Sequence, residues 1–514
     1  MSARGIGAAL RHSVIFVHRW LGVGLCLVFL VWFPSGFVMM YWDYPSVRPS
    51  DRLERAPALN GSQVRLSPVE AAGRAGLEPS GPVTLNMFDG RPVYRFGVGG
   101  AQTIVYADTG DERAPFSKEI VERIASEWTG QPVGVASVES IEDVDQWTLQ
   151  SRIRDLKPLW KYSWPDGQHL YVSQATGEVV QYTTTGSRWG AYLGAIPHWF
   201  YYTPLRRHGP LWSQVVIWFS GIGTVGAFLG LVVGVWMYSP SRRYRHAGAP
   251  TSIPYHGWKR WHIIIGLGIG VGAVTWAFSG MLSMDPFPMP QAGGPAGEGG
   301  RRVSHSVQQA LRGIGPLDAF VAKPPRAALA QLANLRVKEL ELMAFAGQPA
   351  YLATIAPGDT RVVPLDGEPL PGFDPRRIME VAMRVAQPQG GAAVRVLSQY
   401  DRYYRDRHRQ LPLPVVLVEL NDVEHTRLYI DSKTARTVGS YSARNWMSRW
   451  LYHGFHSLDF PWLYNYRPAW DIVVIAFMTG GTALSVTSLV LAWQVLGRKL
   501  RATHGPVITT AESS

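Results

Sequence analysis

The sequence predicts an α+β integral membrane protein with four transmembrane helices, formed by tandem duplication of one unit. The first observation is that four apolar stretches of the 514-residue chain carry no charged side chain and are long enough to span a bilayer, at residues 21–40, 211–238, 263–284 and 472–497. The second is that long polar segments separate the first stretch from the second and the third from the fourth. The third is that the two halves repeat the same residues in the same order.

The first apolar stretch is expected to stay in the mature protein as a membrane anchor. Arg4, Arg11 and Arg19 precede it, as in a signal peptide. However, the stretch is long, and the bulky residues 39–42 (MMYW) follow it where a cleavage site requires small side chains. The chain has 20 Trp, many of them within or beside the four stretches, as in proteins whose rings lie at membrane–water interfaces. Lipid is therefore an expected partner.

Basic residues predict which side of the membrane each segment occupies. Three short segments, 1–19, 239–261 and 498–514, carry ten of the twelve net positive charges, and four crossings place all three on one side. Because cytoplasmic segments are enriched in Lys and Arg, we expect a bacterial inner-membrane protein with both termini in the cytoplasm. The basic balance is thus a topology signal, and no nucleic-acid partner is needed to explain it.

This topology divides the chain into six parts. We expect a cytoplasmic N-terminus and first helix at 1–43, a first periplasmic domain at 44–195, an interfacial segment and second helix at 196–240, a cytoplasmic loop and third helix at 241–285, a second periplasmic domain at 286–445, and an interfacial segment, fourth helix and cytoplasmic tail at 446–514. Both outer domains combine helix and strand signals. Residues 67–70 (SPVE) form a helix-capping box, residues 374–375 (DP) repeat that start signal, and runs such as 169–172 (HLYV) alternate as strands do.

The repeat keeps its register through apolar and polar segments alike. An offset of 244 residues relates the first apolar stretch to the third: His18, Gly22, Gly24, Trp32, Ser35, Gly36 and Met40 fall on His262, Gly266, Gly268, Trp276, Ser279, Gly280 and Met284. An offset of 258 relates the approaches to the second and fourth stretches: His198, Pro210 and Trp212 fall on His456, Pro468 and Trp470. Chance similarity between apolar segments does not keep such an order, so we expect the two halves to superpose.

Several classes of protein are excluded by their missing motifs. The single cysteine, Cys26, allows neither a disulfide within the chain nor a Cys-x-x-Cys-His haem attachment. Residues 221–226 match a GxGxxG dinucleotide fingerprint, but they lie in an apolar stretch and follow no strand, so we interpret them as helix packing. The sequence has no Walker loop, HExxH motif or nucleophile elbow. It also shows no flavin or nicotinamide site.

Three motifs together resemble a known family. They are HRWLG at 18–22, YDRYYRDRH at 400–408 and WLYHGFHSLDFPWLY at 450–464. In this combination the chain resembles the PepSY-associated transmembrane family along nearly its whole length. The resemblance implies that the outer domains are PepSY modules. Some members of the family are inner-membrane reductases for ferric siderophores that carry b-type haem, whereas others have no assigned activity.

Four histidines at two depths are the candidate haem ligands. The inner pair, His18 and His262, begins the first and third helices on the cytoplasmic side, and the outer pair, His198 and His456, precedes the second and fourth helices on the opposite side. Ionisable residues at spanning helices are costly and indicate function. Two halves related by a pseudo-twofold axis would bring each pair together, as a haem iron with two axial histidines requires. We therefore expect two b-type haems, whose iron is the expected metal.

Alternatives remain at both depths. His453 lies three residues before His456 on the same helical face, and is a second candidate for the outer ligand or a partner of a haem propionate. His256 is a weaker alternative beside the inner pair. A histidine at a helix end is otherwise often an interfacial anchor. Gly36 and Gly280 either leave room for a flat macrocycle or allow close helix packing.

The expected function is electron transfer across the inner membrane. Electrons would pass from a quinol or a separate reductase to an acceptor outside, and the resemblance implies that this acceptor is iron(III) bound to a siderophore. A polar aromatic cluster at residues 401–408 either touches such a metal complex or belongs to a sheet surface. The rival hypothesis is a binding or regulatory module, with PepSY domains anchored by four helices and no redox cofactor. A Soret absorption band would distinguish the two.

Overall fold

The structure is a computed structural model that describes residues 3–78, 81–97, 102–112, 117–287, 295–406 and 409–503. The chain divides into two compact units. The membrane unit comprises Met1–Tyr44, Gly186–Pro288 and Met447–Ser514, and the α+β unit comprises Pro45–Thr185 and Met289–Trp446. Each unit is therefore built from both halves of the chain.

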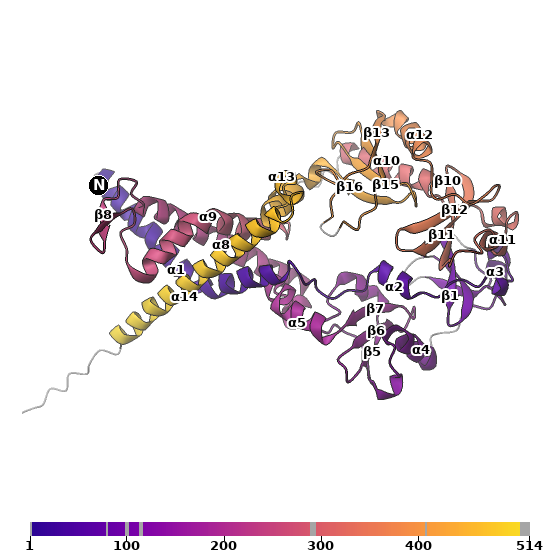
Figure 1. The fold of residues 1–514 in the computed structure, drawn as a ribbon, viewed down its shortest axis with the longest axis horizontal. Helices are drawn as coiled ribbons and strands as arrows, with labels where there is room; N and C mark the ends of the chain where they lie inside the picture. Colours follow the sequence, from indigo (N-terminus) through magenta and orange to yellow (C-terminus); the bar gives the residue numbers. More distant parts are fainter. Residues whose placement is uncertain are drawn as a thin grey trace, which may run out of the picture. The chain divides into compact units, whose positions relative to one another are not determined.

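Four long helices dominate the membrane unit (Figure 1). They are α1 (Ala3–Val38), α8 (Gly209–Met237), α9 (Gly257–Leu282) and α14 (Ala469–Thr503). Each contains a stretch long and apolar enough to cross a bilayer, which confirms the four predicted membrane helices. Helix α1 begins well before its apolar stretch, and its one proline, Pro34, lies near its C-terminal end.

The four helices pack as a ring in which each has two main neighbours. Helix α1 contacts α8 and α14, and α9 contacts the same two helices, so α1 and α9 lie at opposite corners. Glycines allow the close approach. A Cβ atom on Gly272 of α9 would lie 2.6 Å from the Phe477 ring of α14, and one on Gly481 of α14 would overlap the Phe33 ring of α1. Gly223 of the GxGxxG run likewise faces a ring of α1, as the packing interpretation predicts.

One antiparallel sheet of six strands joins the two halves within the α+β unit. Its order is β12-β11-β10-β1-β2-β3, formed by β1 (Val83–Phe88), β2 (Arg91–Phe96), β3 (Thr103–Tyr106), β10 (Glu339–Phe345), β11 (Gln348–Ala356) and β12 (Asp359–Pro364). Strands β1 and β10 pair with Val83 opposite Leu342 and Leu85 opposite Leu340. The two polar segments, which we expected to form two outer domains, therefore share one central sheet.

Each half adds a four-stranded antiparallel sheet and a helix. The first sheet comprises β4 (Ser137–Ile141), β5 (Leu159–Ser163), β6 (His169–Ser173) and β7 (Val179–Thr183), and the second comprises β13 (Ala392–Leu397), β14 (Val415–Leu420), β15 (Arg427–Asp431) and β16 (Thr437–Tyr441). Helix α4 (Lys118–Thr129) packs on the first and α12 (Pro375–Ala386) on the second. This mixture of helices and small sheets confirms the predicted α+β class.

Shorter elements complete the two units. In the α+β unit they are α2 (Pro49–Arg55), α3 (Pro68–Arg74), α10 (Pro295–Leu311) and α11 (Pro325–Ala330). In or beside the membrane unit they are α5 (Thr185–Leu193), α6 (Ala195–Trp199), α7 (Thr203–Arg206), α13 (Pro461–Tyr464) and the hairpin of β8 (Tyr244–His246) and β9 (Ala249–Thr251). A π-helix covers Met447–Gly454.

Local capping explains where two helices of the α+β unit begin. Ser67 Oγ accepts a hydrogen bond from the Glu70 amide at 3.2 Å, and the Glu70 carboxylate accepts one from the Ser67 amide at 2.8 Å. Pro68 occupies the first helical position of α3. Asp374 caps α12 by accepting from the Arg376 amide at 2.9 Å. Both predicted helix starts are confirmed.

The same buried hydrogen bond occurs in both halves of the central sheet. Tyr94 of β2 is fully buried and donates its hydroxyl proton to the carbonyl of Leu66 at 2.7 Å. Tyr351 of β11, 257 residues later, is equally buried and donates to the carbonyl of Lys323 at 2.6 Å. Each bond satisfies a hydroxyl that would otherwise be costly in an apolar core, and each ties the sheet to the segment before it.

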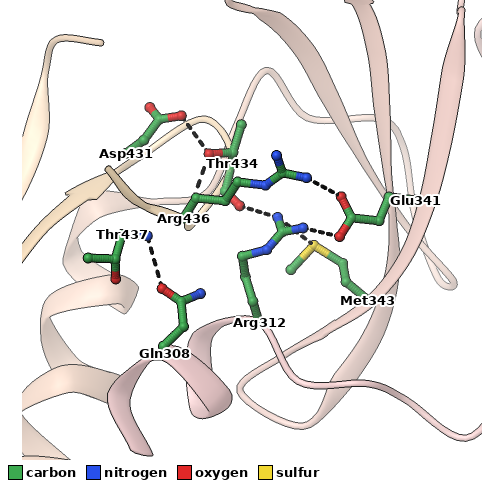
Figure 2. Close-up of polar contacts among 8 residues, drawn as sticks. All are labelled: Gln308, Arg312, Glu341, Met343, Asp431, Thr434, Arg436 and Thr437. Atoms are coloured by element: carbon green, nitrogen blue, oxygen red, sulfur yellow. Dashed lines mark hydrogen bonds and ion pairs between the residues drawn. The ribbon is translucent and has the colours of Figure 1, made fainter. Parts of the chain in front are cut away.

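A buried ion-pair cluster connects the central sheet to the second four-stranded sheet (Figure 2). Arg312, next to the end of α10, pairs with Glu341 of β10, and Arg436 donates to the other carboxylate oxygen at 2.7 Å. Arg312 also donates to the carbonyl of Thr434, between β15 and β16, at 2.6 Å. The side chains of Arg312 and Glu341 are only 8% and 14% exposed. The cluster therefore holds three elements together around a shielded Arg312–Glu341 pair, with the Arg436 side chain, 54% exposed, at its edge.

We expect Glu341→Ala to lower the free energy of unfolding of the α+β unit by about 3–5 kcal/mol, because it leaves Arg312 buried without its paired carboxylate. Glu122→Ala is the control, since Glu122 pairs with Lys118 on the surface of α4 and its loss should cost at most about 1 kcal/mol. Denaturant unfolding of the purified full chain, followed by tryptophan fluorescence, measures both variants. Equal effects would contradict a stabilising role for the buried cluster.

Candidate functional site

Both predicted histidine pairs belong to the membrane unit. His18 lies in α1 and His262 in α9. His198 lies in the short helix α6, and His456 follows the π-helix. We expected His18 at the start of a helix, and this was wrong: α1 begins at Ala3, which places His18 about four turns inside it.

The rings of the inner pair face each other across the bundle. The ring centres of His18 and His262 are 6.3 Å apart, with 34° between the ring planes. Nδ1 of His18 lies 3.0 Å from the carbonyl oxygen of Gly226 in α8. Nδ1 of His262 lies 3.0 Å from Thr487 Oγ1 in α14. The two helices at the other corners of the bundle thus each orient one ring.

The outer pair has the same arrangement with a more symmetrical set of partners. The ring centres of His198 and His456 are 6.0 Å apart, with 66° between the planes. Nδ1 of His198 lies 3.1 Å from Ser35 Oγ and 3.2 Å from a carbonyl oxygen one turn earlier in α1. Nδ1 of His456 lies 3.1 Å from Ser279 Oγ and 3.3 Å from the corresponding carbonyl oxygen of α9.

These partners determine which nitrogen of each ring carries the proton. Ser35 Oγ and Ser279 Oγ donate to helix carbonyls at 3.0 and 3.2 Å, and Thr487 Oγ1 donates to the carbonyl of Leu484 at 2.7 Å. Each hydroxyl has one proton, so toward its histidine it must accept, and the carbonyl of Gly226 accepts only. Carbonyl oxygens beside His18, His198 and His456 make Nδ1 the donor in these three rings, so that Nε2 keeps a lone pair. At His262 the 2.7 Å hydrogen bond from Thr487 Oγ1 to the Leu484 carbonyl favours the same tautomer. Among the described residues no hydrogen bond reaches any of the four Nε2 atoms.

The ring-centre separation of each pair matches that expected of two imidazoles that would share one iron atom. Two imidazoles bound to opposite sides of a metal, with bonds of about 2 Å, have ring centres about 6 Å apart. The Cβ position of Gly22, one turn after His18 on the same face, has no atom within 4 Å in the described structure. Gly36 and Gly280 pack closely instead: the Cβ position of Gly36 lies 3.2 Å from the Met478 side chain and 3.3 Å from Cε1 of His198, and that of Gly280 lies 3.4 Å from Cε1 of His456. At these two glycines the contacts favour the packing interpretation.

Burial keeps the outer pair neutral. Removal from water lowers the pKa of His198 to about 4. The same burial, with the neighbouring His198 ring as a smaller cause, lowers the pKa of His456 to about 3. Because the charged form is disfavoured, both rings are neutral at any pH well above 4. A neutral imidazole is the form that binds a metal, so no proton competes for Nε2 near neutral pH.

The alternative histidines have other surroundings. His453 is exposed, and its ring packs on the preceding tyrosine with 4.8 Å between centres, whereas the ring opposite His198 belongs to His456. His256 is exposed as well, and its Nδ1 lies 2.7 Å from Nδ1 of His246 in the β8–β9 hairpin. Neither ring contacts a predicted pair across the bundle in the part of the chain described.

In the polar aromatic cluster at 401–408, the Asp401 side chain is engaged in hydrogen bonds within the α+β unit. The Asp401 carboxylate accepts hydrogen bonds from the backbone amides of Tyr403 and Tyr404 at 2.8 and 2.7 Å. It also accepts one from the hydroxyl of Tyr429 in β15 at 2.9 Å. This favours the sheet-surface interpretation over a metal-complex contact. His408, the last residue of the cluster, lies outside the described residues.

Sequence reasoning missed the residues that support the inner pair. Thr487 and Ser488 are adjacent hydroxyl residues in an apolar helix, and Ser488 Oγ lies 3.5 Å from Nδ1 of His262. Gly230 of α8 lies flat against His18, because a Cβ atom there would be 2.5 Å from the ring carbon Cε1. The offset of 258 residues relates Gly230 to Ser488. This correspondence between Gly230 and Ser488 could have identified the supporting residues from the sequence, since both positions border an inner histidine.

The fold and the two histidine pairs define a multispanning membrane protein whose helix bundle encloses paired, oriented imidazoles and whose polar segments form an α+β unit. A family model described as the PepSY-associated TM region matches residues 15–334. The chain therefore belongs to the PepSY-associated transmembrane family. The match includes His18, His198 and His262. Among curated proteins none matches this chain.

Proposed function

We propose that this protein is a transmembrane electron carrier that holds two b-type haems, one between His18 and His262 and one between His198 and His456. The observation that carries the proposal is the pairing of the rings, at 6.3 and 6.0 Å between ring centres, with every Nδ1 within hydrogen-bond distance of a helix carbonyl or hydroxyl. A histidine with a purely structural role needs no partner ring at this distance.

The chain's own residues would orient, insulate and separate the two sites. A bound haem would supply an iron that takes up and releases one electron. The histidines would hold that iron from both sides as neutral ligands, and the surrounding apolar helices would exclude water. His18 and Ser35 are 17 residues apart in α1, which is about 25 Å along a helix axis. The two sites would thus lie near opposite faces of a hydrocarbon core of about 30 Å.

The donor and acceptor follow from the family resemblance and from what the sequence lacks. With no flavin or nicotinamide motif in the chain, the donor in this proposal is a quinol or a separate reductase. The acceptor is iron(III) in a siderophore complex on the outer side. The alternative is a PepSY-type regulatory module without a redox cofactor, in which the histidines serve only as anchors.

We further infer that the two halves arose by tandem duplication. Supporting contacts recur at the offsets found in the sequence. Trp212 Nε1 donates to the carbonyl of Trp199 at 2.7 Å, and 258 residues later Trp470 Nε1 donates to the carbonyl of Ser457 at 3.0 Å. With the hydroxyls of the outer pair and the buried tyrosines of the central sheet, such repeats favour one ancestral unit over convergence.

The proposed location is the bacterial inner membrane, with both termini in the cytoplasm and the α+β unit in the periplasm. It rests on the concentration of basic residues in 1–19, 239–261 and 498–514. Fusions after Gly110 and Gly367, both in turns of the α+β unit, should be active with an export-dependent reporter enzyme. Activity of a cytoplasm-dependent reporter at either position would refute this topology.

The direct test of the function is the absorption spectrum of the purified protein. Expressed with haem supplementation and extracted in detergent, the full chain should carry two haems and show a Soret band with the bands of low-spin, bis-histidine iron. Dithionite should reduce it, and a ferric chelate should reoxidise it. A protein without stoichiometric haem after supplementation would overturn the proposal and favour the regulatory module.

A further inference from the structure

The inner pair is supported unequally on its two sides. His18 donates Nδ1–H to a backbone carbonyl, that of Gly226. His262 instead donates to a side-chain hydroxyl, Thr487 Oγ1 at 3.0 Å, with Ser488 Oγ at 3.5 Å as a more distant second acceptor. Thr487 is only 4% exposed, so water does not replace it easily. Of the three acceptors at this site, only the two hydroxyls facing His262 can be removed by changing a side chain.

The hydroxyls of α14 are held so that their lone pairs face His262. Thr487 Oγ1 and Ser488 Oγ both donate to the carbonyl of Leu484, at 2.7 and 2.9 Å. Each hydroxyl proton is thus committed to its own helix. A hydroxyl without a spare proton can act toward an imidazole only as an acceptor. The pair therefore orients the ring of His262 and favours the tautomer with the proton on Nδ1.

We propose that Thr487, with Ser488 in reserve, is a positioning residue that sets the reduction potential of the inner site; this rests on the proposed function. An acceptor at Nδ1–H raises the basicity of the opposite nitrogen, which makes the imidazole a stronger ligand. A stronger ligand stabilises iron(III) relative to iron(II) and lowers the reduction potential. Removing the hydroxyls should therefore raise the potential and loosen the haem at this site alone.

The outer site provides an internal comparison. Each outer Nδ1 has a serine hydroxyl at 3.1 Å and also a helix carbonyl at 3.2 or 3.3 Å. Ser35→Ala or Ser279→Ala leaves the carbonyl as an acceptor. At His262 no carbonyl acceptor lies beside the two hydroxyls among the described contacts. The effect of removing hydroxyls should accordingly be larger at the inner site than at the outer one.

The test is a redox titration of the haem-loaded full chain, followed by absorption, with Thr487→Val combined with Ser488→Ala. The equilibrium constant of one of the two reduction steps should shift about tenfold toward the reduced form. The reduction potential of that step would rise by about 59 mV for one electron. The shift should persist in a His456→Ala background, where only the inner site remains. When Thr487→Ser is made in place of Thr487→Val, a hydroxyl is kept at this position. The wild-type reduction step, and any haem lost from the double variant, should then be restored.

Ser485→Ala is the matched control. Ser485 is a buried hydroxyl of the same helix, 2% exposed, and it donates only to the carbonyl of Gly481 at 2.8 Å among the described contacts. It should leave both steps in place. Two bound haems with unchanged potentials in the double variant would overturn this inference and leave the proposed function standing. Absence of haem from the wild-type protein would overturn both.

Discussion

His18→Ala and His262→Ala should each remove one of the two proposed haems and stop the proposed electron transfer between the two faces of the membrane. In the proposed site each substitution would take away one of the two histidines that hold the iron and would leave the opposite ring as the only protein ligand. Haem that stays at the site would have an open coordination position and a changed spin state. The outer pair should keep its low-spin spectrum, because its ligands come from other segments. The measurements are haem content per chain and reduction of an external ferric chelate.

The outer pair should give the reciprocal result. His198→Ala and His456→Ala should remove the other haem, and a variant lacking one inner and one outer histidine should be colourless. His453→Ala and His256→Ala are the matched controls, because both side chains are exposed and lie outside the facing pairs. Loss of haem in His453→Ala with a silent His456→Ala would show that the outer ligand had been assigned to the wrong histidine. Unchanged spectra in all four single variants of the pairs would exclude haem ligation by them.

The pairing of the histidines could be predicted because it depends on features that a sequence displays directly. Charge-free stretches of spanning length specify the helices, since a bilayer tolerates few alternatives. The offset of 244 relates His18 to His262, and two parallel copies must place equivalent residues at one depth. The choice between His453 and His456 could not be predicted in the same way. It depends on the π-helix, whose wider turn changes which side chains share a face.

What the sequence did not predict depends on contacts between distant segments. Pairing of β1 with β10 joins residues more than 250 positions apart, and nothing local distinguishes these strands from those of two separate domains. Arg312 and Glu341 are unremarkable charges in the sequence, and only the docking of two sheets buries them. The acceptors for the inner pair come from α8 and α14, which the repeat relates to each other but does not place against His18 or His262.

Gly230→Ala should abolish or greatly weaken haem binding at the inner site while leaving the outer site intact. A Cβ atom at this position would lie 2.5 Å from Cε1, 3.0 Å from Nδ1 and 3.2 Å from Nε2 of His18, which means that it overlaps the ring. The ring would have to move away from the Gly226 carbonyl and out of line with His262. Overpacking of this kind costs about 1–3 kcal/mol, or roughly 5- to 150-fold in affinity.

Gly230→Ala is informative because it should stabilise helix α8 itself, whereas it should weaken haem binding at the inner site. Alanine is favoured over glycine in a helix interior by about 1 kcal/mol, so α8 itself should not be destabilised. Gly268→Ala is the control, since Gly268 lies in α9 with no atom within 4 Å of its Cβ position in the described structure. Haem content, the low-spin spectrum and the inner reduction step should all be retained in that variant. Two haems with wild-type spectra in Gly230→Ala would mean that His18 does not need its present position, and the inner site would have to be assigned elsewhere.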